Sequence, residues 1–169
     1  TIANVGSFNV DAQTGITVGS VASTSASLDA FTGNIVAAAD NAAYEIDAGT
    51  GSVQIRAYQG SIGGSNGFSV RGGSVALNGG GSGSVGSIGS VAKPVIVNST
   101  GNLNVETAGT FNIIGKDASD VLQSFSGMTV EMRAAGIGST SSIVAANFPV
   151  SDFAGNAFMP TSDGTTITL

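Results

Sequence analysis

Cysteine, histidine and tryptophan are all absent from this chain of 169 residues. The lack of cysteine excludes disulfide bonds and thiolate chemistry, and the lack of histidine removes the commonest general base and metal ligand. Charged residues make up only 9% of the chain, far below the roughly 25% of an ordinary soluble domain. Because so few side chains are ionisable or nucleophilic, we expect a protein that is not an enzyme.

The few charges present are also unbalanced. Five basic residues stand against eleven acidic ones, and the resulting net charge of −6 repels a phosphate backbone and predicts no binding to nucleic acid. No run approaches the ~20 apolar residues that span a bilayer, so we expect no membrane insertion. The sequence starts at Thr1 without a basic and apolar leader. We interpret the chain as an extracellular or cell-surface protein whose signal peptide is absent or already removed.

What the chain does contain is a recurring Thr-Gly pair. Thr-Gly occurs at 14–15, 32–33 and 50–51, so the three pairs are equally spaced along the sequence. Alternating apolar residues follow, such as Ile16 and Val18, and this period of two is typical of a β-strand with one buried face. A fixed step of this kind indicates a structural unit that is used repeatedly.

We therefore predict a single all-β domain over residues 1–169. Two architectures fit short strands separated by glycine-rich turns: a parallel β-helix, in which the chain winds as a solenoid, and an antiparallel β-sandwich or jelly roll. Residues 79–91 are predicted as an ordered glycine- and serine-rich excursion, and residues 115–169 as a part without the repeat. One short helix is expected near 117–125, capped by Ser119 or Asp117. The predicted strands cover residues 7–10, 16–21, 27–30, 34–37, 44–46, 52–57, 68–71, 74–77, 94–97, 103–106, 110–114, 128–133, 143–150 and 165–169.

Several phrases of the sequence share one rhythm. They are Thr-Gly-Asn-Ile-Val at 32–36, Gly-Thr-Gly-Ser-Val-Gln-Ile at 49–55, Gly-Gly-Ser-Val-Ala-Leu at 72–77, and residues 99–113. Over residues 8–114 the rhythm resembles the coils of filamentous-haemagglutinin-like exoproteins. The resemblance implies a right-handed parallel β-helix, secretion across the outer membrane by a partner transporter, and a role in adhesion or cell contact. The sequence departs from a strict repeat after Gly51, since the next step, to Gly73, is longer than the steps before it.

Oxygen-bearing side chains gather between residues 40 and 47. Asp40, Asn41, Glu45 and Asp47 offer the hard ligands that Ca²⁺ prefers, so they are candidates for a calcium site. Solvated turn residues are the alternative explanation of the same cluster. We expect no other cofactor or metal.

The two ends of the chain contain alternating segments, 2–10 and 165–169, that we predict to be assembly strands, added to the sheet of a neighbour. We expect a non-enzymatic, extracellular structural or adhesive protein that assembles through strand edges into a filament or surface layer. Its partners are copies of itself, with a host surface or a glycan as a further partner. The alternatives are a viral coat or decoration subunit and a polysaccharide-degrading β-helix enzyme. The predicted assembly residues are Ile2, Val5, Phe8, Val10, Ile167 and Leu169.

Overall fold

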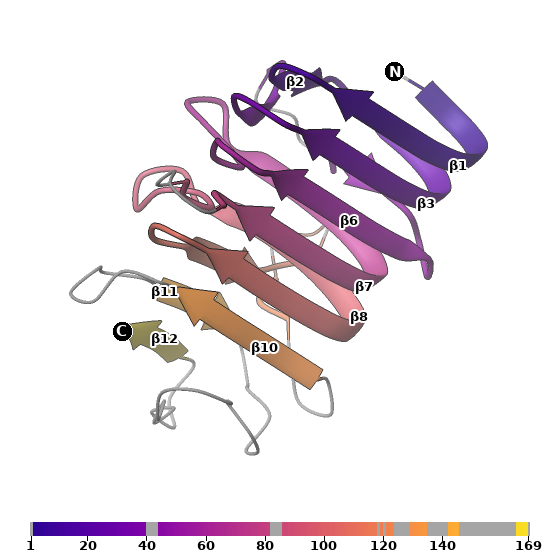
Figure 1. Cartoon of the computed structure of the whole chain (residues 1–169). Coiled ribbons are helices and arrows are strands. Elements are labelled where there is room, and N and C mark those ends of the chain that lie inside the picture. The colour runs from indigo at the N-terminus through magenta and orange to yellow at the C-terminus, as the bar shows by residue number, and fades with distance from the viewer. Residues whose placement is uncertain are drawn as a thin grey trace.

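The computed structural model describes residues 2–39, 44–81, 86–117, 119, 121–123, 129–134, 142–145 and 165–168. In these ranges every regular element is a β-strand, which confirms the all-β prediction (Figure 1). The strands are β1 (Ile2–Ala12), β2 (Ile16–Val18), β3 (Val21–Ala30), β4 (Ile35–Ala37), β5 (Ile46–Asp47), β6 (Ser52–Ala57), β7 (Phe68–Gly79), β8 (Val95–Thr107), β9 (Asn112–Gly115), β10 (Thr129–Ala134), β11 (Ser142–Ala145) and β12 (Thr165–Thr168).

Strand pairing is parallel for every pair of these strands except β11 with β12. Parallel neighbours require the chain to cross over before it returns to the same sheet. An antiparallel sandwich or jelly roll instead joins neighbouring strands by hairpins. Of the two architectures that the sequence left open, the parallel register therefore favours the coiled one.

The strands form three rows, which the chain visits in turn. Row A contains the later parts of β1, β3, β7 and β8, and the strands β6 and β10, which lie side by side in Figure 1. Row B contains β5, β9 and β11 with the first residues of β1, β3, β7 and β8. Row C contains β2 and β4 and is continued by single bridges from Ile35 through Ile62 and Ile88 to Phe111.

Row A aligns residues of the same character in successive coils. Strand β6 alternates exposed and buried residues, as a strand with one inward face should. The column that starts at Phe8 continues through Ala26, Val53, Val75, Leu103 and Val130. The intervals between these aligned residues are unequal, so the coils differ in length although the register is kept.

The interior between the rows is apolar. Each large side chain in it contributes about 1.5–3 kcal/mol by leaving water. Row C shows the pattern most simply, because the four aligned positions from Ile35 to Phe111 are all 1% exposed or less. The largest fully buried side chains are Phe111, Leu28, Ile35, Ile46, Ile55, Ile62, Leu77, Ile88, Leu103, Ile113 and Ile143.

Glycines stack where row A turns into row C. A Cβ on Gly60 would lie 2.0 Å from the carbonyl oxygen of Gly33, and one on Gly86 would lie 2.0 Å from that of Gly60. The backbones of successive coils therefore approach too closely for any side chain. Thr14-Gly15 and Thr32-Gly33 both lie at this corner, where a Cβ on Gly33 would come within 3.0 Å of the Gly15 nitrogen.

The third Thr-Gly pair lies at a different corner. A Cβ on Gly51 would meet the carbonyl oxygen of Thr24 at 1.7 Å, and this is where row B turns into row A. The Thr-Gly step therefore describes one coil and is not the general repeat. The longer coils contain turns such as 63–67. Of the predicted glycine- and serine-rich excursion 79–91, residues 82–85 lie outside the described residues, and the stretch from 86 onward joins row C at the fully buried Ile88.

The expected helix near 117–125 is wrong for the residues described there. Lys116 forms an antiparallel bridge with Leu122, and the Asp117 backbone N–H donates to the Val121 carbonyl over 3.0 Å. The Asp117 carboxylate accepts hydrogen bonds from the N–H groups of Ser119 at 2.8 Å and Val121 at 3.0 Å. An aspartate that bonds to nearby N–H groups in this way stabilises a turn in competition with a helix. Across the described ranges, no helix is long and apolar enough to cross a membrane.

Beyond residue 115 the rows continue, which the sequence does not reveal. β10 extends row A beside β8, and β11 extends row B beside β9. β12 then pairs with β11 in the antiparallel sense.

Candidate functional site

The outer edge of β1 is the first candidate site, since β1 has a strand partner, β3, on one side alone in the described part of the chain. The carbonyl of Gly6 accepts from the Thr24 hydroxyl over 2.6 Å, and the carbonyl of Ala12 accepts from the Phe31 N–H over 2.9 Å. Backbone groups alternate in direction along a strand, so Asn9 and Asp11 direct theirs to the opposite side. The edge thus presents main-chain donors and acceptors that a further strand can bind.

The predicted assembly residues lie differently from one another. Phe8 and Val10 are partly buried and pack against the core, so their side chains support the fold, and an added strand would contact the backbone of β1. Ile2 and Val5 belong to the early part of β1, where Ile2 aligns with Val21 and Val5 with Ser23. At the other end of the chain, Ile167 aligns with Ile143 in the β11–β12 pair, and Leu169 lies outside the described residues.

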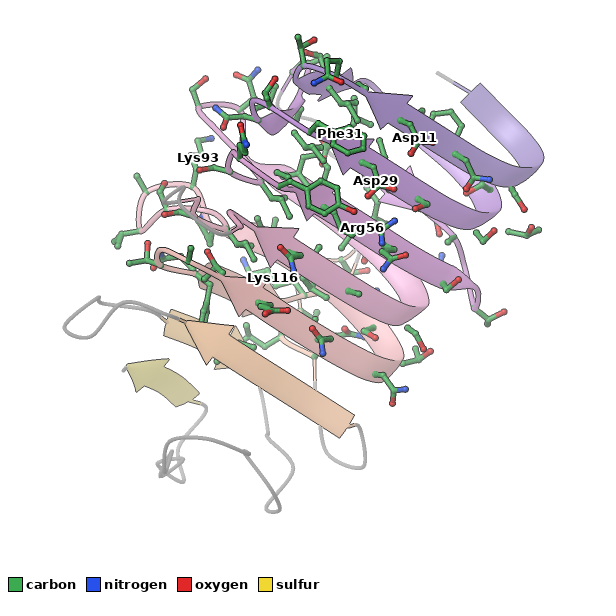
Figure 2. The ribbon with its side chains drawn as sticks, in the orientation of Figure 1. Asp11, Asp29, Phe31, Arg56, Lys93 and Lys116 are labelled. Carbon is green, nitrogen blue, oxygen red and sulfur yellow. The ribbon has the colours of Figure 1, made fainter. Side chains whose placement is uncertain are left out.

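A second candidate lies on the outward side of row A, where polar residues form a column across successive strands. Asp11, Asp29, Arg56, Asn78 and Glu106 are aligned by the strand register. Figure 2 shows Asp11, Asp29 and Arg56 one above another on this face. The Asn78 amide donates to the Glu106 carboxylate over 3.2 Å. A side-chain hydrogen bond therefore links two neighbouring coils at this point of the column.

The strongest link in this column is the ion pair between Arg56 and Asp29. The guanidinium donates through Nε to Asp29 Oδ1 and through Nη2 to Asp29 Oδ2 over 2.7 Å, which is the two-pronged geometry that arginine and carboxylate favour. This hydrogen bonding lowers the pKa of the Asp29 carboxyl, against the opposing effect of burial. The same contact raises the pKa of Arg56. Both groups are therefore charged in the folded protein at neutral pH.

Beside the ion pair lies an aromatic pair that the sequence analysis missed. The rings of Phe31 and Tyr58 are stacked with centroids 5.4 Å apart and planes 23° apart. The Arg56 guanidinium lies 5.9 Å from the centre of the Tyr58 ring, within reach of a cation–π interaction. Phe31 is 50% exposed and Tyr58 36% exposed. In the sequence, the only indication of this pair is the number of residues between Phe31 and Tyr58. That number predicts a contact only when the length of the coil between them is known.

A hollow of about 330 Å³ lies on the outward side of row A, with Arg56 among the residues that line it. Its polar lining comes from neighbouring strands: Gln54 and Arg56 from β6, Asn78 from β7, and Asn104 and Glu106 from β8. Arg56 thus lines the hollow and also lies against the Tyr58 ring of the aromatic pair. We call the whole set, Asp29, Phe31, Gln54, Arg56, Tyr58, Asn78, Asn104 and Glu106, the row A patch.

The two calcium candidates that the structure describes, Glu45 and Asp47, are engaged in other contacts. Glu45 is 2% exposed, and its carboxylate accepts from the Ser69 N–H over 2.6 Å and also from the Ser69 hydroxyl. The Asp47 carboxylate accepts from the Gly49 N–H over 2.9 Å and lies 3.4 Å from Arg71 Nη1. A guanidinium at that position competes with a bound cation. Asp40 and Asn41 lie outside the described residues.

Calcium binding accordingly stays a prediction. Among the residues that can be described, no group of three or more acidic or other metal-ligating side chains could hold a metal ion.

A series of side-chain hydrogen bonds in the interior connects distant coils. Asn98 donates to the Tyr44 hydroxyl over 2.6 Å, and the Gln123 amide donates to the Asn98 side-chain oxygen over 2.7 Å. Burial raises the pKa of the Tyr44 phenol, so it stays protonated. These hydrogen bonds tie the segment after β9 to an earlier coil, so the side chains that form them have a structural role. Sequence reasoning missed it because these residues are far apart along the chain.

No family model matches this sequence, and neither the curated proteins nor the solved structures contain a match to it. The resemblance to filamentous-haemagglutinin-like exoproteins thus stays a prediction.

Proposed function

We propose that this chain is a non-enzymatic structural and adhesive protein of the cell exterior, which assembles by pairing the edges of its strands into a filament or surface layer. The observation that carries the proposal is the outer edge of β1, where the backbone groups of Asn9 and Asp11 point away from β3. Within one copy, row A already consists of parallel strands that pair in register. A second copy extends the same row without any new kind of contact.

The use of polar side chains supports a structural role. The described Asp29, Arg56, Glu45 and Asn98 make hydrogen bonds between coils. In a parallel coil, such contacts fix the register of one strand on the next, since a shift by one residue would separate the partners.

The partner surface on the neighbouring copy is the far edge of β10, the last strand of row A in the described ranges. Continuing the register of row A sets Val130 beside Phe8 and Glu131 beside Asn9. Arg133 then aligns with Asp11, so the paired positions carry opposite charges. The contact is head-to-tail, and a head-to-tail contact that does not close into a ring produces a filament.

The test replaces one backbone donor of the edge. Asn9→Pro removes the N–H that points away from β3 and leaves the hydrogen bonds to β3 in place. Asn9→Ala keeps that N–H and is the matched control. We expect filaments or sheets from the parent chain and from Asn9→Ala, and dispersed particles from Asn9→Pro, by electron microscopy and sedimentation.

A second pair of variants separates loss of assembly from loss of fold. Asp11→Lys should weaken assembly by placing two cations together, and the double variant Asp11→Lys, Arg133→Glu should restore it. Assembly by Asn9→Pro as efficient as that of Asn9→Ala, with both folded by circular dichroism, would overturn the proposal. Closed shells in place of fibres would select the viral coat alternative.

A further inference from the structure

The row A patch combines two features that a purely structural surface does not need. One is a pair of large apolar rings left in water, and the other is a set of planar polar side chains around a hollow. Burying a ring of this size contributes about 1.5–3 kcal/mol, yet Phe31 is 50% exposed and Tyr58 36% exposed. Exposed apolar groups gathered beside directed polar groups are typical of a binding site.

The aromatic pair is held in place before any ligand arrives. The two rings stack at 5.4 Å, and Arg56 lies 5.9 Å from the Tyr58 ring centre. Arg56 is itself fixed by two hydrogen bonds to Asp29, whose side chain is only 8% exposed. A surface ordered in advance loses little conformational entropy when it binds a ligand.

The hydrogen-bonding groups suit a ligand with many hydroxyls. Arginine has five N–H donors, and the contacts of Arg56 with Asp29 use Nε and one N–H of Nη2. The other N–H groups remain on a residue that lines the hollow. Gln54 and Asn78 add amides, and Glu106 adds a carboxylate. Groups that both donate and accept match neighbouring hydroxyls, each of which also does both.

The dimensions of the hollow and the charge of the residues around it limit the chemical class of ligand that can bind there. The hollow crosses β6, β7 and β8, and three strands at about 4.8 Å spacing span roughly 10 Å, the length of a disaccharide. The aligned column holds three acidic positions, Asp11, Asp29 and Glu106, against two basic ones, Arg56 and Arg133. The excess of negative charge disfavours a carboxylate or sulfate ligand. The C–H face of a pyranose ring carries a slight positive charge, and the face of an aromatic ring is negative.

We infer that the row A patch binds a neutral oligosaccharide. A sugar ring stacks on the Phe31–Tyr58 pair, and the next ring lies in the hollow, where Arg56, Gln54 and Asn78 bond to its hydroxyls. The site is distinct from the β1 edge and does not need assembly. It rests on the adhesive part of the proposed function and adds a specific ligand class to it.

The test measures binding of defined sugars to the whole chain by isothermal titration calorimetry. The probes are cellohexaose, maltohexaose, mannohexaose and chitohexaose, with hexagalacturonate as the acidic probe. We expect at least one neutral probe to bind with a Kd of about 10 μM to 1 mM. Tyr58→Ala and Asn78→Ala should each weaken that binding by about tenfold or more.

Two controls distinguish binding from folding. Tyr58→Phe keeps the ring and should retain the affinity within about threefold. Val91→Ala shortens the side chain of a residue that is 82% exposed and lies outside the patch, and it should leave binding unchanged. Thermal unfolding of each variant reports whether the fold persists.

The outcomes also separate this site from the assembly edge. Asn9→Pro should bind the neutral sugar as well as the parent chain does, whether or not assembly fails in that variant. The inference is wrong if none of the neutral probes binds, if Tyr58→Ala and Val91→Ala bind alike, or if hexagalacturonate binds more tightly than every neutral probe.

Discussion

At the scale of single residues, Asp29 and Arg56 show how a charge becomes useful only after folding. The two residues are far apart along the chain, and nothing in the sequence pairs them, because coil length varies from one turn to the next. Folding aligns them in neighbouring strands of row A. The carboxylate then holds the guanidinium beside the exposed aromatic pair.

Asp29→Asn should lower the free energy of unfolding at neutral pH by about 1 kcal/mol, since a hydrogen bond to a charged group is lost but Arg56 remains partly solvated. The Arg56 side chain is 33% exposed, which is why the expected cost is modest. Urea denaturation of Asp29→Asn and of Glu106→Gln, a matched change at an exposed carboxylate of the same column, measures the difference. Equal effects of the two substitutions would contradict the assigned role of the ion pair.

The same contact predicts a pH dependence. Folding lowers the pKa of Asp29 below its ordinary value of 3.8, so the ion pair stabilises the fold fully above that value. The stabilisation is lost as the pH falls through the folded pKa. The stability difference between the parent chain and Asp29→Asn should therefore stay constant from about pH 7 down to the region of 3.8 and shrink as the pH falls below that value.

At the scale of elements, the sequence located most strands but divided the long ones. The sequence predicts 68–71 and 74–77 as separate strands, and they form the single strand β7. Of the two predicted strands 94–97 and 103–106, residues 95–97 and 103–106 likewise belong to the single strand β8. The glycines between them were interpreted as turns. In the structure the strand bends there from row B into row A, with a register shift between Gly72 and Ser74.

The corner between rows A and C offers a direct test of close coil packing. Gly60→Ala places a Cβ 2.0 Å from the Gly33 carbonyl oxygen, so the backbone must shift. We expect a loss of about 1–3 kcal/mol in unfolding free energy, as for other overpacked sites.

Gly6→Ala is the matched control for this corner, because a Cβ there has nothing within 4 Å. Its effect should stay within about 0.5 kcal/mol. Chemical denaturation of both variants compares them, and a tolerated Gly60→Ala would show that the coils can separate at this corner.

At the scale of the whole molecule, net charge governs how readily two copies approach each other and pair their strand edges. The chain carries −6 at pH 7 and has an isoelectric point near 4.1. Copies repel one another above that pH, and the repulsion weakens as carboxylates become protonated or as salt screens them.

Assembly should consequently become faster as the pH falls from about 7 toward the isoelectric point, and also with added salt at neutral pH. Light scattering follows the rate, with Asn9→Pro as the control for nonspecific precipitation. If Asn9→Pro responds to pH as the parent chain does, the association does not use the β1 edge.

The sequence by itself determined that this is an all-β protein, because alternating apolar residues and glycine-rich turns act locally, within a few positions of the chain. It also indicated a repeated unit, although the Thr-Gly step holds for one coil only. Tertiary structure alone decided that the strands pair in parallel, that Asp29 meets Arg56 and that Phe31 meets Tyr58. Those contacts depend on the length of each coil, which turns and excursions set, and no local pattern records that length.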